Sequence, residues 1–184
     1  YIFAAQAGAA SSILFNTALA KLEEVNSYKA LQNPMLKGKI LINDPTISGS
    51  GETFFAISVE YYTSEDYWRD MVKNQSLVIV RDQRQLVEWI AFGKYVVALA
   101  PAPGPDYEFV KAGAPLKKTN PAEGSYLTTG FGGISLMNKA PHLAAAKAFI
   151  NWFLSKEGQI VYSDSSDRQS ARIDVSAEGI SISA

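Results

Sequence analysis

Short apolar runs alternate with helical patterns along most of this chain, and that alternation limits the folds open to it. Most of the runs are rich in β-branched or aromatic residues, which is typical of buried strands. The predicted strands are Ser12–Phe15, Lys39–Asn43, Leu77–Val80, Tyr95–Ala100 and Pro115–Lys118, and Tyr126–Met137 is predicted to be extended. Because strands that alternate with helices build a sheet covered on both faces, we predict an α/β fold.

Helical patterns fill the segments between these strands. Ser64, Asp82 and Ser155 are predicted N-caps, because their side-chain oxygens can accept the free N–H groups of a first helical turn. We also predict a weak helix over Ala18–Val25. The other predicted helices are Glu52–Tyr62, the segments that follow Ser64 and Asp82, Asp106–Lys111, Leu143–Leu154 and Lys156–Tyr162.

Composition excludes several classes of protein. The net charge is −1, and Lys and Arg are scattered among acidic residues, so nucleic-acid binding has little electrostatic support. No apolar stretch reaches the roughly 18–20 residues of a membrane span. The chain has no cysteine, which excludes disulfides, Cys-ligated zinc and thiol nucleophiles.

The turn Ser48-Gly49-Ser50-Gly51 joins a predicted strand to a predicted helix. Free backbone N–H groups and the positive end of the helix dipole meet there, Ser48 and Ser50 add hydroxyl donors, and the glycines let a ligand approach the main chain. This geometry binds carboxylate, phosphate or sulfate. The alternative is a plain helix start after a turn. The turn is no P-loop, since no Lys follows the second Gly.

Arg81 and Arg84 stand at the next junction between a strand and a helix. Ligands of open α/β sheets lie off the carboxyl ends of the strands, so either guanidinium could bind a carboxylate. The alternative is a solvated helix start that Asp82 caps.

Tyrosines and the single histidine raise the question of a metal. Tyr61 and Tyr62 could offer phenolates to ferric iron, but adjacent helical positions point about 100° apart, which suits one core and one half-buried residue. Tyr126 lies in a glycine-flanked extended stretch and is the better candidate for lining a cleft. His142 has no second His or Cys as a co-ligand, and no Gly-x-Ser-x-Gly elbow is present, so we expect neither a metal site nor a hydrolase.

Two segments, Asn43–Gly51 and Ala140–Gln159, together resemble the extracellular solute-binding proteins of ABC importers, in particular the group related to ferric-ion binders. The likeness covers most of residues 12–175, and its strength is the collinear order of its motifs. The other matching stretches are Asn16-Thr17, Ser27–Pro34, Lys37–Ile40, Tyr67-Trp68, Gly93–Tyr95, Gly113–Pro115, Pro121–Gly124 and Ser170–Val175.

This resemblance implies a periplasmic-binding-protein type II-like lobe, a mixed sheet flanked by helices, with additional C-terminal helices. Residues 1–16 would be the end of the first lobe and one hinge crossing, and residues 17–131 the second lobe. Residues 132–184 would be the returning hinge strand, the C-terminal helices of the first lobe and a polar tail. Most of the first lobe is then expected upstream of this sequence.

The resemblance also implies the site. Ser48, Gly49, Ser50, Gly51, Arg81 and Tyr126 would face the cleft between the lobes, with no cofactor and no metal. The ferric binders' adjacent tyrosine pair has no counterpart near Tyr126. We therefore expect a small anion as the solute, with ferric iron as the alternative ligand.

We thus expect a periplasmic or extracellular binding protein that delivers a small anionic solute to the membrane permease of an ABC transporter and is not an enzyme. The alternative is an effector-sensing domain of a transcription regulator, which can share this fold. A helix-turn-helix or a signal peptide in the full gene distinguishes the two.

The helices predicted between residues 143 and 162 carry a wide apolar face that includes Phe149, Ile150, Trp152 and Phe153. The absent lobe would cover part of this face, and exposed patches of this kind seek partners. We expect the chain to dimerise through it, which sedimentation velocity measures. A monomer with these side chains deeply buried in the same chain would contradict the missing lobe.

Overall fold

The chain forms two compact units. The computed structural model describes residues 2–4, 12–102, 104–125, 133–166 and 170–176. Residues 10–126 form the larger unit, and residues 1–9 with 127–183 form the smaller unit. The predicted boundaries, 16/17 and 131/132, lie a few residues further along the chain. Ile13–Asn16, which we assigned to the hinge, is a strand of the larger unit's sheet, because its apolar side chains are buried there.

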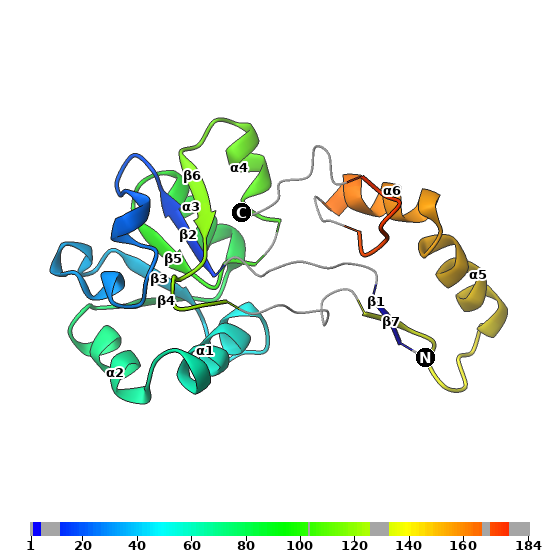
Figure 1. Ribbon diagram of the computed structural model, residues 1–184, viewed down its shortest axis with the longest axis horizontal. Coiled ribbons are helices and arrows are strands. Elements are labelled where there is room, and N and C mark those ends of the chain that lie inside the picture. Colours follow the sequence, from blue (N-terminus) through cyan, green and yellow to red (C-terminus); the bar gives the residue numbers. More distant parts are fainter. Residues whose placement is uncertain (1, 5–11, 103, 126–132, 167–169, 177–184) are drawn as a thin grey trace. The chain divides into compact units, whose positions relative to one another are not determined.

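A five-stranded mixed sheet organises the larger unit. The strand order is β4-β3-β5-β2-β6 (Figure 1). Strands β3, β4 and β5 run parallel, whereas β2 is antiparallel to both of its neighbours, β5 and β6. The strands are β2 (Ile13–Asn16), β3 (Ile40–Asn43), β4 (Val78–Val80), β5 (Val97–Leu99) and β6 (Leu116–Thr119). The predicted mixed α/β fold is confirmed.

Both faces of this sheet are buried. Alternate residues of a strand point to opposite faces, so Ile13 and Leu99, which are paired across β2 and β5, lie in one core with Phe54 and Trp68. The next pair of residues, Leu14 and Ala98, lies in the other core, against α3. Helices α1 (Ser50–Tyr61) and α2 (Glu65–Lys73) cover the first face, and α3 (Gln83–Ala91) covers the second (Figure 1).

The helix starts follow the predicted capping chemistry. The Ser64 hydroxyl accepts the N–H of Tyr67, and the Asp82 carboxylate accepts the N–H of Gln85 at 2.8 Å. The Ser155 hydroxyl accepts the N–H of Gly158. Each of these bonds satisfies an N–H group that the helix itself cannot pair. The N-cap predictions are therefore confirmed.

The helix predicted over Ala18–Val25 is wrong. This segment is a turn followed by a 3₁₀ helix, η1 (Leu22–Glu24). The Asn16 side chain accepts the N–H of Ala18, and the Glu24 carboxylate accepts the N–H of Lys21 at 2.7 Å. These local side-chain bonds offer the backbone an alternative to the α-helix. Two more 3₁₀ helices follow, η2 (Ala30–Gln32) and η3 (Pro34–Leu36), and α4 (Tyr107–Lys111) precedes β6.

The smaller unit contains a two-stranded antiparallel sheet and two helices. Strand β1 (Ile2–Ala4) pairs with β7 (Gly133–Ser135), and α5 (Leu143–Phe153) packs against α6 (Lys156–Ser166). The Gln159 side chain is buried and bonds the Phe153 carbonyl and the Ser170 hydroxyl. Within this unit, Phe149 and Trp152 are 54% and 44% exposed.

Gly51 allows α1 to begin directly against the end of β3. A Cβ atom at this position would overlap the Asn43 carbonyl oxygen and lie 2.8 Å from the Asp44 carbonyl oxygen. Both neighbours are backbone atoms at a buried point, so they cannot rotate away. The second glycine of the predicted anion-binding turn is thus required for packing.

We therefore expect Gly51→Ala to lower the free energy of unfolding by roughly 1–3 kcal/mol, the usual cost of overpacking a core. Helix propensity alone predicts the opposite sign, since Ala is favoured over Gly within a helix by about 1 kcal/mol. Urea denaturation measures the change. The exposed neighbour offers a control, because Glu52→Ala should change stability by less than about 0.5 kcal/mol. A stabilised Gly51→Ala protein would contradict the close packing.

Candidate functional site

The carboxyl ends of β3, β4 and β5 meet at one edge of the sheet, because these three strands are parallel. Strands β3 and β4 are each followed at once by polar residues. The turn from Asp44 leads into α1, Arg81 and Asp82 lead into α3, and Ala100 begins the segment after β5. We call this place the strand-end site and define it by Asn43, Asp44, Ser50, Gly51, Arg81 and Gln83.

Ser50 ties the three strand ends together. Its hydroxyl donates to the Ala100 carbonyl at 2.8 Å and accepts the Gln83 side-chain N–H at 2.9 Å. The Gln83 side-chain oxygen in turn accepts the N–H of Ala102. A hydroxyl has a single proton to donate, so the Ser50 hydroxyl is already committed. We predicted a hydroxyl donor for a ligand here, and the structure shows that hydroxyl bonded within the protein.

Asn43 fixes the beginning of α1. Its side-chain oxygen accepts the backbone N–H of Gly51 at 3.2 Å, and its side-chain nitrogen donates to the Val80 carbonyl at 3.1 Å. The N–H of Thr53 bonds the Gly49 carbonyl. Among the described residues, the N–H groups of Ser50 and Glu52 have no acceptor. The helix start therefore retains two backbone donors.

Asp44 joins the first two strand ends. One carboxylate oxygen accepts the hydroxyl of Thr46 at 2.6 Å and its N–H at 2.9 Å, and the other accepts Arg81 Nε at 2.8 Å. The Thr46 bonds, followed by the Arg81 guanidinium, lower the pKa of Asp44 to about 2. Asp44 is therefore ionised near neutral pH, and it is already engaged by three donors.

Two other cations near this edge, Lys118 and Arg84, are paired. Lys118 Nζ lies 2.7 Å from an Asp106 carboxylate oxygen, and both side chains are largely buried. Arg84 was also a predicted candidate. Its Nη1 lies 3.7 Å from Oε2 of Glu108 on the surface, and an exposed ion pair of this kind contributes little to stability. Arg81 differs, because its Nη1 and Nη2 groups have no partner among the described residues.

The remaining candidates are dispersed. Ser48 is exposed at the turn, and Gly49 has a φ of 152°, which favours glycine. Tyr126 lies outside the described residues. Tyr61 is 72% exposed and Tyr62 is half-buried, with its hydroxyl donating to the Ser125 carbonyl, so the prediction of one core position in this pair is wrong. Tyr61 is the last residue of α1 and Tyr62 is its C-cap, and of the two only Tyr62 packs against the core.

Sequence reasoning missed Asn43, Asp44 and Gln83 as members of the site. A signal was present for Asn43 and Asp44, because polar residues directly after a buried parallel strand stand at the ligand edge of the sheet. Gln83 offered no such signal. It is the first residue of α3, and its role depends on bonds to residues that are distant in sequence.

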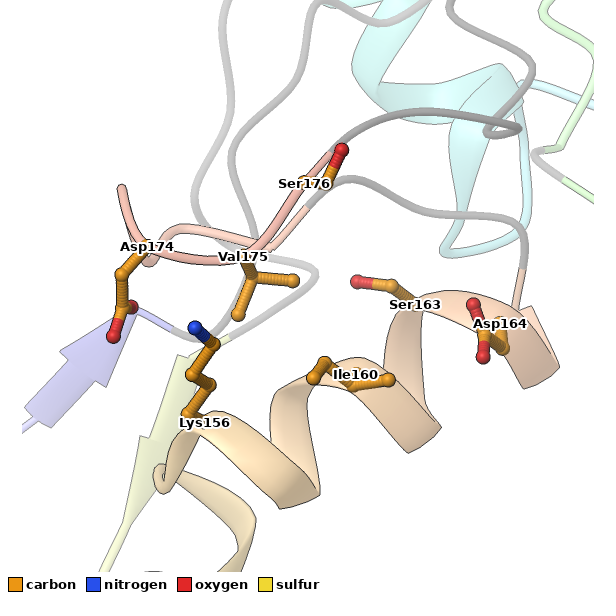
Figure 2. A pocket seen from close by; sticks show the side chains of 7 residues that line it. All are labelled: Lys156, Ile160, Ser163, Asp164, Asp174, Val175 and Ser176. Carbon is orange, nitrogen blue, oxygen red and sulfur yellow. The ribbon is translucent and has the colours of Figure 1, made fainter.

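A hollow of about 440 Å³ lies beside α6 in the smaller unit, and Figure 2 shows the side chains that line it. Side chains of one α6 face and of the segment after it line the hollow, and the Ser163 hydroxyl is buried there without a partner among the described residues. Lys156 and Asp174 bring charges of both signs. The lining residues are Lys156, Ile160, Ser163, Asp164, Asp174, Val175 and Ser176.

The described part of the chain shows neither a cluster of metal ligands nor a membrane-spanning helix. No group of three His, Cys, Asp or Glu side chains lies close enough together to hold a metal ion. No helix there has the length and apolarity needed to cross a bilayer.

Comparisons with known proteins identify one family. A model described as bacterial extracellular solute-binding protein matches residues 4–178. An uncharacterised protein of Haemophilus influenzae is 33% identical over 153 residues, which are 77% of this chain and 41% of that protein. The chain thus spans less than half the length of this curated relative.

Solved structures share the fold at lower identity. The periplasmic binding protein AfuA of Actinobacillus pleuropneumoniae, with fructose-6-phosphate bound, is 24% identical, with a TM-score of 0.74, over 97% of this chain and 57% of that one. Iron-bound HitA of Pseudomonas aeruginosa is 18% identical, with a TM-score of 0.77, over 97% and 58%. The ferric binding protein of Campylobacter jejuni is 20% identical, with a TM-score of 0.73, over 95% and 58%. The predicted type II periplasmic-binding-protein fold is confirmed.

The environment of Asp44 predicts how stability depends on pH. Because its pKa is lowered in the folded protein, the unfolded chain binds more protons between about pH 4, the ordinary Asp value, and pH 2. The stabilisation from this carboxylate is therefore complete above about pH 4 and is lost as the pH falls toward 2. In urea denaturation, the stability difference between wild type and Asp44→Asn should shrink across this window. A difference that stays constant or grows would contradict the assignment.

Proposed function

The chain belongs to the bacterial extracellular solute-binding proteins, and we propose that its strand-end site forms one wall of the binding site for a small anionic solute. One observation carries the anion proposal. The edge offers Arg81 Nη groups and the N–H groups of Ser50 and Glu52 as donors, while the carboxylate of Asp44 is already engaged.

The local charges favour an anion over a cation. The start of α1 presents the positive end of a helix dipole, and Arg81 adds a permanent cation. Both carboxylate oxygens of Asp44 already accept hydrogen bonds from Thr46 and Arg81, so neither is free to coordinate a cationic solute. Two further acids stand beside these donors in sequence. Glu52 lies exposed in the first turn of α1, and Asp82, which follows Arg81, caps α3 by accepting the N–H of Gln85. A solute with a carboxylate or phosphate group fits this set of donors best.

Ferric iron is the weaker alternative. Iron prefers oxygen and nitrogen ligands that carry or share negative charge, and the strand-end site has no unengaged carboxylate among its members. The phenol of Tyr61 is exposed at the far end of α1 from this edge. Among the similar solved structures, AfuA has a sugar phosphate bound and HitA has iron bound, and the donors of this chain agree with the former.

We further propose that the protein acts outside the cytoplasm and passes its solute unchanged to the permease of an ABC importer. Membership in an extracellular solute-binding family supports this role over effector sensing in a transcription regulator. Catalysis is not part of the proposal, because the Ser50 hydroxyl donates to a backbone carbonyl and the carboxylate that accepts the Thr46 hydroxyl has a lowered pKa, which makes it a weak base.

The solute can be identified by native mass spectrometry of the protein purified from its host, and then titrated by calorimetry. Arg81→Ala should weaken binding of that solute about tenfold or more, because a hydrogen bond to a charged group contributes roughly 1.5–3 kcal/mol. Arg84→Ala is the matched control, since Arg84 stands three residues away and pairs with Glu108. Equal affinities for wild type and Arg81→Ala would place the solute elsewhere.

A further inference from the structure

The two side chains of the ion pair between Asp44 and Arg81 differ in their exposure to solvent. The Asp44 side chain is 5% exposed, whereas the Arg81 side chain is 77% exposed, and a single contact of 2.8 Å joins Oδ2 to Nε. Thr46 holds the other oxygen of Asp44 through its hydroxyl and its backbone N–H. The carboxylate is thus fixed to its own turn, and it holds the arginine at one atom.

Because Asp44 bonds Arg81 at Nε, the other guanidinium nitrogens of Arg81 remain available as donors. A guanidinium carries five N–H groups in a planar fork. When Nε–H bonds a carboxylate, the pair of Nη1 and Nη2 groups at the tip stays available, and those groups have no partner among the described residues. The tip matches two oxygens of one oxyanion, which it can bind through two parallel hydrogen bonds.

We propose that Asp44 is a positioning residue for solute binding. It holds Arg81 by Nε so that the guanidinium tip receives two oxygens of a carboxylate or phosphate group on the solute. This inference rests on the proposed function and names the chemistry at that same site. Asp44 itself does not touch the solute.

Two effects of Asp44 on an anion oppose each other. Its negative charge repels the solute, so removal of the charge alone should strengthen binding. Its bond to Nε restricts a long, exposed side chain that would otherwise lose rotamer freedom on binding, so removal of the bond should weaken binding. The positioning role predicts that the second effect is the larger. The direction in which Asp44→Asn changes the affinity for the anion therefore shows which of the two effects is larger.

The test is an NMR titration of the protein with inorganic phosphate, and separately with acetate, which distinguishes the two oxyanion classes. Asp44→Asn should weaken binding of the preferred probe about threefold to tenfold. In the Arg81→Ala background, the same change should not weaken it further, because Asp44 acts through Arg81. Tighter binding by Asp44→Asn, or an equal loss in both backgrounds, would overturn the proposal.

Thr46→Val is the matched control. It removes the hydroxyl that Asp44 accepts on its other oxygen and leaves the contact with Arg81 Nε in place. Its affinity for the probe should stay within about twofold of wild type. A loss as large as that of Asp44→Asn would mean that the turn, and not the arginine, accounts for the effect, and it would overturn the positioning role.

A ligand-free measurement separates this inference from the proposed function. The Nε–H proton of Arg81 should exchange with water more slowly in wild type than in Asp44→Asn, because only wild type bonds it to a carboxylate. Equal exchange rates overturn the positioning role even if an anion binds. If neither probe binds wild type, the oxyanion assignment is overturned and the anionic solute of the proposed function fails with it, whatever the exchange rates.

Discussion

The close approach of α1 to the end of β3 is the contact on which the candidate site depends. Gly51 has no side chain, so the first turn of the helix lies against the carbonyl groups of Asn43 and Asp44. Asn43 then accepts the Gly51 N–H and at the same time donates to the Val80 carbonyl at the end of β4. A helix start and two strand ends are thereby held together before any ligand is present.

The polar side chains at this edge bond mainly to one another and to nearby backbone groups. Ser50 and Gln83 use their polar atoms to connect α1, α3 and the segment after β5, and Asp44 uses both of its oxygens on Thr46 and Arg81. What remains is a set of donors: the tip of Arg81 and two backbone N–H groups. Preorganised donors with few competing acceptors suit an anion, because little reorganisation is needed on binding.

Much of the fold could be predicted from the sequence because its signals are local. The apolar runs gave the five strands of the sheet, and capping side chains such as Ser64 and Asp82 marked helix starts. The helix over Ala18–Val25 failed because Asn16 and Glu24 bond the nearby backbone, which a propensity argument does not weigh. In the candidate site, the sequence pointed to the turn and to Arg81 but not to the residues that bond them. Asp44 lies 37 residues from Arg81, and Ser50 lies 50 residues from Ala100, so only the folded sheet brings these groups together.

We expect an anionic solute to bind at the carboxyl ends of β3 and β4. A crystal structure of the protein with its native solute would show directly where the solute lies. Two solute oxygens should lie within hydrogen-bond distance of Arg81 Nη1 and Nη2, with further solute contacts to the N–H groups of Ser50 and Glu52. A solute bound in the hollow beside α6, or a metal ion held by tyrosine side chains with no contact to Arg81, would contradict this expectation.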